Sequence, residues 1–199
     1  MLKKFLMVGF ILIANTSFVY SKQEPITLAC LPSEGTMEEK ARASYVSAVE
    51  GAFIKAGYNV ADRQRLEKIL KEIKLQDSSN NEDIISKAGK VMKVDYLVAV
   101  IVDYWEEQGL NNRAMEQDRK NDTMKPKEAY YITFEHIRIT LKVIEVETSI
   151  IIAQGNIQDF NIKGYINFFK RDTQNKLAKK VVDKVMKDIK KQIKKKNRN

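Results

Sequence analysis

Residues Tyr96–Val102 form an almost wholly apolar run, which constrains the fold more than any other feature of the chain. A short apolar run without alternation is typical of a strand that is buried on both faces. We therefore expect this run to be the central strand of a sheet and the deepest part of the core. Together with the helical patterns around it, it predicts a single α/β domain with a mixed β-sheet.

The residues near the start of the chain have the pattern of a βαβ unit. Ile26–Leu31 is apolar and is followed by a proline, as expected for a buried first strand. Thr36 with Glu39 three positions later is a capping-box pattern, and Gly57 is a typical C-terminal stop, so a helix is predicted between them. A short strand after the glycine completes the unit.

Three more helices are predicted to flank the sheet. Asp62 is placed to cap the first of them, and residues 84–92 carry the apolar stripe of the second. The third covers about residues 167–195 and has apolar positions at four-residue spacing among many lysines. It should be a long, basic, amphipathic helix that packs on the sheet or on a partner.

The later strands are expected to be antiparallel. Tyr130–Val146 and Ile150–Gln158 have strand patterns and are joined by a turn, so with the central strand they predict a meander. The apolar positions of the longer strand change phase between Phe134 and Ile137, which we attribute to a β-bulge. Residues 106–128, by contrast, are polar without periodicity and are interpreted as an exposed loop or a partly disordered insertion.

The N-terminal residues 1–21 read as a secretory signal peptide. Lys3 and Lys4 precede an apolar core at Phe5–Ala14, which is too short for a membrane span of about 20 apolar residues. The mature chain is then expected to be one domain, 22–199, in the periplasm or at the periplasmic face of the outer membrane.

The single cysteine, Cys30, excludes an internal disulfide. Leu28 and Ala29 before it loosely resemble a lipobox, so lipidation is an alternative. However, a polar run separates Cys30 from the apolar signal core, where a lipobox adjoins that core directly. We therefore favour a buried strand cysteine.

Positive charge is concentrated at the end of the chain. The formal net charge is +9 at pH 7, and residues 176–199 alone hold eleven Lys and Arg against two Asp. The folded body is therefore not basic, and nucleic acid, which usually binds a basic face, is not an expected partner.

Several short strings resemble the CsgG/LpoB group of envelope proteins. The resemblance covers roughly residues 26–157, and its strings are Leu28–Pro32 (LACLP), Ala56–Arg63 (AGYNVADR), Leu66–Glu72 (LEKILKE), Ala88–Gly89 with Val94–Tyr96 (VDY), and Val146–Thr148 (VET). It implies a small α/β fold, akin also to the N-terminal domain of TolB. One branch of the group builds curli-type secretion pores, and another activates penicillin-binding proteins, so a non-catalytic assembly or activator role is implied.

The chain departs from this group at three places. Val100 and Ser149 stand where the group usually has glycine. The 106–128 insertion lacks the outward apolar alternation over about ten residues that a membrane-spanning β-hairpin needs. The two glycine replacements are compatible with the fold, whereas the insertion and the lack of a lipid anchor at Cys30 favour a soluble or peripheral relative over a pore.

Residue types for catalysis are sparse. His136 is the only histidine and lies in a predicted strand, so a structural role is favoured over a catalytic one. One His and one Cys do not make a metal site, and no glycine-rich phosphate loop is present. We expect no enzyme activity, no metal and no cofactor.

Two surfaces are predicted to bind partners. Tyr104 and Trp105 end the central strand, and such aromatic residues are enriched at protein interfaces. The lysines of the last helix form either a solvated face or a contact with anionic membrane or wall polymers; the residues in question are Lys187, Lys190, Lys191 and Lys194. The expected partner is a penicillin-binding protein or a secretion subunit, and the alternative is a homo-oligomer formed through an edge strand or the last helix.

Overall fold

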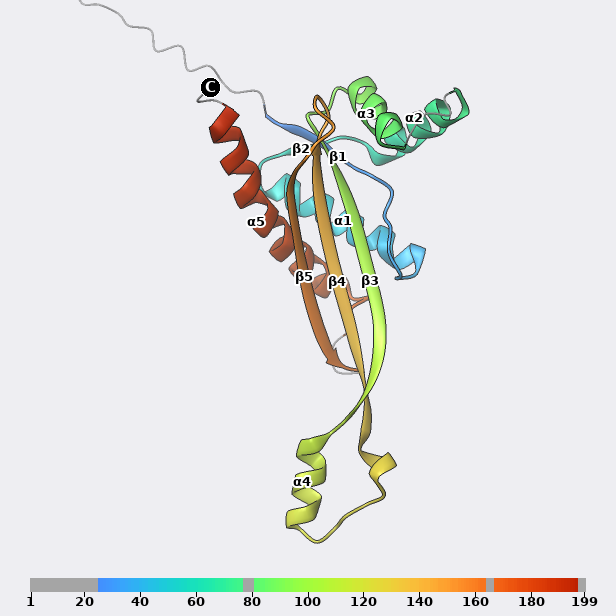
Figure 1. Ribbon diagram of the computed structural model, residues 1–199, viewed down its shortest axis with the longest axis vertical. Helices are drawn as coiled ribbons and strands as arrows, with labels where there is room; N and C mark the ends of the chain where they lie inside the picture. Colours follow the sequence, from blue (N-terminus) through green and yellow to red (C-terminus); the bar gives the residue numbers. More distant parts are fainter. Residues whose placement is uncertain (1–24, 77–80, 164–166, 197–199) are drawn as a thin grey trace, which may run out of the picture.

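The computed structural model describes residues 25–76, 81–163 and 167–196. Its strands form one mixed sheet in the order β2-β1-β3-β4-β5 (Figure 1). Strand β1 is parallel to β2 and β3, whereas β3, β4 and β5 are antiparallel. The predicted α/β fold is confirmed, with strands β1 (Thr27–Cys30), β2 (Asn59–Val60), β3 (Tyr96–Leu110), β4 (Tyr131–Glu145) and β5 (Ile151–Ile162).

Helices cover the two faces of the sheet unequally. Helices α1 (Glu39–Lys55) and α5 (Arg171–Lys196) pack along one face, where they share an apolar core with β1, β3 and β4. Helices α2 (Arg63–Gln76) and α3 (Asn81–Met92) pack on the other face, but only at the end where β1 lies (Figure 1). The far half of that second face is therefore left without a helix among the described residues.

Strand β3 is the central strand that its sequence predicted. Leu97 and Val98 are both fully buried, although their side chains point to opposite faces. Val98 joins the core under α1 and α5, and Leu97 joins the core under α2 and α3. The strand therefore needs apolar side chains on both faces, which explains the absence of alternation.

The start of α1 differs from the prediction. The helix begins at Glu39, with Glu38 as N-cap, and no side chain caps it. Thr36 pairs with β3 instead, because its Oγ1 accepts from the Tyr104 backbone N at 3.0 Å and donates to the Tyr104 carbonyl at 3.1 Å. The end is as expected, since Gly57 takes the positive φ of 91° that follows a helix terminus.

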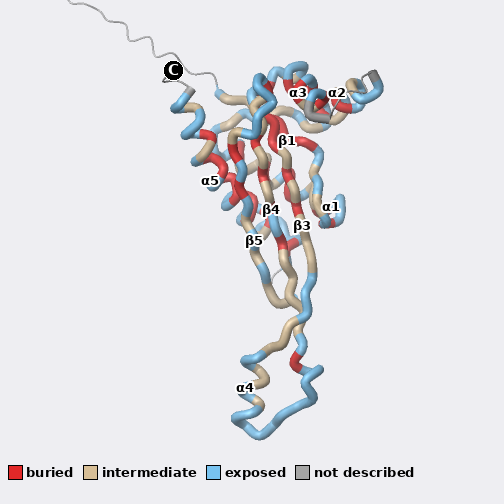
Figure 2. Tube along the Cα trace, in the orientation of Figure 1, coloured by how far each residue is buried: buried red, intermediate tan, exposed pale blue. Residues whose placement is uncertain are grey.

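The 106–128 segment is more regular than the sequence indicated. Strand β3 continues to Leu110, which pairs with Tyr131, and the hairpin ends in helix α4 (Asn112–Lys120) and a 3-10 turn (Lys127–Tyr130). Backbone hydrogen bonds continue the pairing of β3 with β4 into this segment, although its side chains do not alternate between apolar and polar. The Asn111 side chain caps the start of α4. The interpretation of the whole segment as an irregular loop was wrong. The hairpin forms a mostly exposed arm (Figure 2).

The phase change in β4 is not a bulge. Pairing between β3 and β4 is regular over the whole strand, and the register of β4 shifts only toward β5, between Val143 and Ile144. Phe134 lies instead on the opposite face from Ile137, where its ring covers Gly109. The apolar side chains of β4 thus change from one face of the sheet to the other along the strand, with no break in its pairing to β3.

Helix α5 and the turn before β5 follow the sequence closely. The helix begins at Arg171, four residues later than predicted, and its apolar edge is buried. Ser149, which replaces an expected glycine, has a positive φ of 59° and holds the turn. The buried residues of the apolar edge are Leu177, Val181, Val185 and Ile189.

The sequence also led to expectations about export, lipid attachment and membrane insertion. The predicted signal peptide 1–21 lies outside the described residues. Cys30 is fully buried in β1, as predicted, which makes its thiol unsuitable for lipid attachment in this fold. Within the described ranges, no helix has the length and apolarity needed to cross a membrane.

Candidate functional site

Tyr104 and Trp105 are neighbours in the sequence but lie on opposite faces of the sheet. Tyr104 is paired with Ile137 and packs on the core side, 5.9 Å from the ring of Phe169. Trp105 is paired with His136 on the other side, where no described helix lies. The structure therefore separates the two residues that the sequence grouped in one contact site.

The hydroxyl of Tyr104 belongs to a network of polar side chains. Its hydroxyl lies 2.9 Å from a carboxylate oxygen of Glu106 and 3.0 Å from one of Glu135. Burial, and then these hydrogen bonds, raise the pKa of Tyr104. Lys163 donates to both oxygens of Glu106, at 2.9 and 3.1 Å, and this contact lowers the pKa of Glu106. The network joins β3, β4 and the residue after β5.

Trp105 belongs to a row of rings that crosses three strands. Its ring is stacked on that of His136, with centroids 5.0 Å apart and planes 5° from parallel. His136 in turn lies 5.9 Å from Phe160 on β5, whose side chain is 62% exposed. The Arg138 guanidinium lies 5.3 Å from the Trp105 centroid, within cation–π range. We call these four residues the aromatic face.

Polar side chains surround the aromatic face. The Arg138 guanidinium donates to the Gln158 amide oxygen at 3.3 Å, and Asp103 lies opposite Arg138 in the β3–β4 register. Asn156 and Gln158 on β5 are exposed and point to the same side, since residues of like parity share a face. An apolar centre with a polar rim is the usual anatomy of a protein interface.

His136 does not have the surroundings of a catalytic base. Its Nε2 lies 3.5 Å from a Glu107 carboxylate oxygen, and neither ring nitrogen has a hydrogen-bond partner among the described residues. Its ring packs against those of Trp105 and Phe160, and no hydrogen bond joins it to a serine, threonine or cysteine of the described residues. The arrangement is suited to holding an aromatic surface in place.

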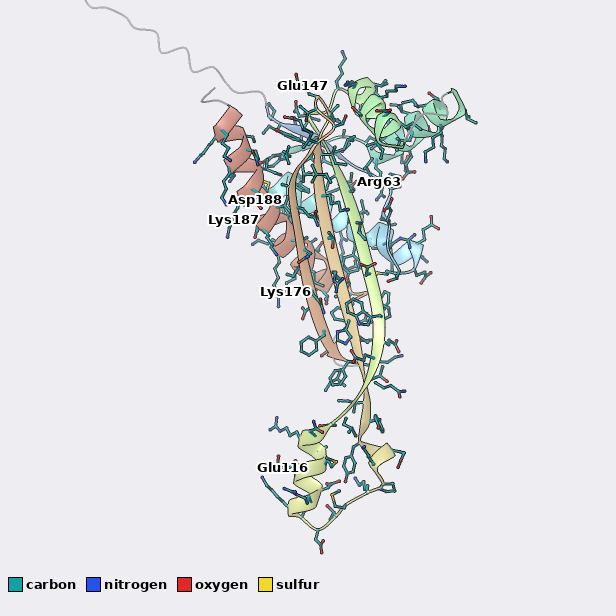
Figure 3. All side chains as sticks on the ribbon, viewed as in Figure 1. Arg63, Glu116, Glu147, Lys176, Lys187 and Asp188 are labelled. Atoms are coloured by element: carbon teal, nitrogen blue, oxygen red, sulfur yellow. The ribbon has the colours of Figure 1, made fainter. Side chains whose placement is uncertain are left out.

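The predicted lysines all lie on the exposed side of α5, and two of them border a cavity. Lys187, Lys190, Lys191 and Lys194 are exposed. Lys191 and Lys194, with Lys195, line a cavity of about 430 Å³ between α5 and the start of β5. Lys191 also pairs with Asp188 at 3.3 Å. Figure 3 shows Lys176 near the start of α5, and Lys187 and Asp188 further toward its C-terminal end.

Sequence reasoning missed Arg138 and Phe160 as members of the aromatic face. The signal for them is the strand register, which places residues 105, 136 and 160 in one row across β3, β4 and β5. That register cannot be read from any one strand alone. No cluster of metal-ligating side chains occurs within the residues that the structure describes.

Comparisons with known proteins give a likeness of fold. No family model matches the sequence, and no match was found among curated proteins. A solved structure of lipoprotein GNA1162 from Neisseria meningitidis is similar over 82% of this chain and 99% of that one, with TM-score 0.51 and 11% identity.

Two other solved structures give lower TM-scores. A PelC dodecamer from Paraburkholderia phytofirmans covers 81% of this chain and 89% of its own, with TM-score 0.47 and 10% identity. The LpoB C-terminal domain from Escherichia coli covers 67% and 82%, with TM-score 0.41 and 13% identity. This chain therefore has the fold found in a bacterial lipoprotein.

Proposed function

We propose that this protein is a non-catalytic interaction module of the bacterial envelope, which binds another envelope protein through the aromatic face. The single observation that carries the proposal is the row of Trp105, His136 and Phe160 on a sheet face that no described helix covers. The other face of the same strands is covered by α1 and α5.

The composition of this surface is that of a binding site. Trp and Arg are the side chains most enriched among residues that dominate interface energetics, and Phe is enriched in interface cores. An exposed Phe160 costs free energy in water, and a partner that covered it would remove that cost. We infer that the partner presents an apolar surface to this face.

The class of partner is inferred from the family resemblance and the predicted export. The CsgG/LpoB resemblance implies a penicillin-binding protein or a secretion subunit. The likeness of fold to a bacterial lipoprotein supports an envelope location. The contacts of His136 support a role that depends on binding and not on a reactive side chain.

Site-specific photo-crosslinking in intact cells tests the proposal. A photoreactive amino acid replaces Phe160, and a matched control replaces Ile54, which is 59% exposed on α1 and lies away from the open face. We expect an envelope protein to crosslink at position 160 and not at position 54. Equal recovery at both positions, or no crosslinked protein at position 160, would contradict the proposal.

The alternative function is a structural role as a homo-oligomer. Strand β5 spans 12 residues and is an outer strand of the sheet, so one side of its backbone pairs with no described strand. A long free edge is a template for pairing with a second chain. Light scattering of the mature protein at micromolar concentration separates the two functions, because a monomer mass contradicts the oligomer.

A further inference from the structure

We infer that the end of the molecule formed by the β4–β5 turn and the C-terminal part of α5 binds the surface of an anionic lipid bilayer. The inference rests on the proposed envelope location, but it concerns a different surface from the aromatic face. It combines two exposed isoleucines with the lysines that border the cavity between α5 and β5.

The apolar part of this surface is at the start of β5. Ile150 is 61% exposed and Ile151 is 49% exposed. They directly follow the turn in which Ser149 has its positive φ, and neither is buried in the core. Two adjacent large aliphatic side chains in water are suited to insertion between lipid headgroups.

The basic part of the surface adjoins the isoleucines. Lys191, Lys194 and Lys195 line the cavity of about 430 Å³ whose other wall is Ile152–Gln154, the residues directly after Ile151. Asp188 pairs with Lys191, whereas Lys194 and Lys195 form no ion pair with a carboxylate of the described residues. Two ammonium groups beside a cavity can receive the phosphate of a lipid headgroup.

The pairing of apolar and basic groups decides between the two anionic partners considered from the sequence. A wall polymer would be attracted by the lysines alone and would leave Ile150 and Ile151 in water. A bilayer can contact both the lysines and the isoleucines, because its surface is anionic and the boundary of its acyl chains accepts aliphatic side chains. Glu145 and Glu147 lie at the same turn and oppose binding, whereas Lys191, Lys194 and Lys195 at the end of α5 favour it. Figure 3 shows Glu147 at the turn.

The shape of the molecule is compatible with this attachment. The α4 arm lies at the opposite end of the long axis from the β4–β5 turn (Figure 1). A molecule bound by the turn and the end of α5 would therefore direct the arm away from the bilayer. The aromatic face, on the half of the sheet nearer the arm, would remain accessible to a protein partner.

Vesicle co-sedimentation of the mature protein tests the inference. The probes are vesicles of phosphatidylethanolamine with phosphatidylglycerol, and vesicles of phosphatidylcholine alone. We expect binding to the anionic vesicles at low salt, release at about 0.5 M salt, and no binding to phosphatidylcholine. Absence of binding to the anionic vesicles, or equal binding to both, overturns the inference.

Two double variants locate the surface. Lys194→Glu with Lys195→Glu should weaken vesicle binding by at least about tenfold. The matched control is Lys176→Glu with Lys179→Glu, an equal charge change on exposed positions of the same helix, near its other end. Equal weakening by both variants shows that only net charge matters and overturns the site.

The isoleucines separate a bilayer from other sources of phosphate. Ile150→Ser with Ile151→Ser should also weaken vesicle binding, while thermal unfolding confirms that the fold is kept. If this variant binds as the original does, or if inorganic phosphate at millimolar concentration displaces the vesicles, the site recognises phosphate alone and the inference fails. The vesicle experiments do not affect photo-crosslinking at position 160, so the proposed function is tested independently of membrane binding.

Discussion

Trp105 and His136 form a stacked pair across β3 and β4, with ring planes 5° from parallel and Arg138 close to the indole. The pair holds the indole in one orientation before any partner arrives. A side chain that is already ordered loses less conformational entropy on binding. This preorganisation makes Trp105 the residue whose removal should cost the most binding energy.

The variant Trp105→Ala should weaken binding of the crosslinked partner by about 2 kcal/mol or more, the range of a dominant interface residue. Binding of the purified partner by calorimetry measures the effect. Tyr104→Phe is the control, because it removes a hydroxyl that contacts Glu106 and Glu135 on the opposite face without changing the aromatic face. If the Tyr104 variant binds as poorly as the Trp105 variant, the aromatic face is not the contact.

Replacement of two glycines by alanine should change the stability of the fold in opposite directions. At Gly35, which has a positive φ of 115°, a Cβ would lie 2.2 Å from the Val102 carbonyl oxygen, so Gly35→Ala should destabilise the fold by more than about 2 kcal/mol. At Gly51, inside α1, nothing lies within 4 Å of a Cβ, so Gly51→Ala should stabilise by about 0.5–1 kcal/mol. Urea unfolding measures both changes, and the same sign in both would contradict the structure.

Glu50 should make stability depend on pH. Burial raises the pKa of its carboxyl above the ordinary value, although Arg63 partly offsets this, and its Oε1 has no hydrogen-bond partner among the described residues. A raised folded-state pKa means that the native state binds the proton more tightly, so stability falls as pH rises from the ordinary carboxyl range through the raised value.

The variant Glu50→Gln removes that dependence. We expect it to raise the thermal midpoint at pH 7 and to have little effect at a pH below about 4, where the unfolded carboxyl is also protonated. Thermal unfolding across this pH range measures the difference between the two proteins. A difference that stays constant over the range would show that Glu50 does not titrate as described.

The tip of the arm should be held by one hydroxyl. Tyr130 is buried, and its hydroxyl accepts from the Lys125 backbone N at 2.9 Å and lies 3.0 Å from a carboxylate oxygen of Asp118. Tyr130→Phe should therefore speed hydrogen exchange in α4 while leaving β3 and the global unfolding midpoint nearly unchanged. Unchanged exchange in α4 would show that the hydroxyl does not order the tip.

The Cys30 thiol should be inert in the native protein. It is fully buried, and desolvation raises its pKa, so little reactive thiolate forms. We expect a thiol reagent to modify Cys30 only as fast as the protein unfolds, and rapidly in denaturant. Fast modification under native conditions would place the cysteine outside the core.

The sequence by itself determined the elements whose signal is local. The apolar run at Tyr96–Val102 required burial on two faces, and the stripe in α5 required an apolar surface to pack on, which the structure shows to be the sheet. Gly57 ended α1 because a positive φ is a property of one residue. These patterns are visible in a single segment because each depends on that segment's own periodicity or conformation.

Only the tertiary structure decided how surfaces are assembled from different segments. The register of β3, β4 and β5 set Trp105 beside His136 and Phe160 and put Tyr104 on the other face. Pairing between β3 and β4 also ordered the polar arm, because backbone hydrogen bonds do not require apolar side chains. Both results depend on contacts between residues distant in the chain, which no pattern within one segment contains.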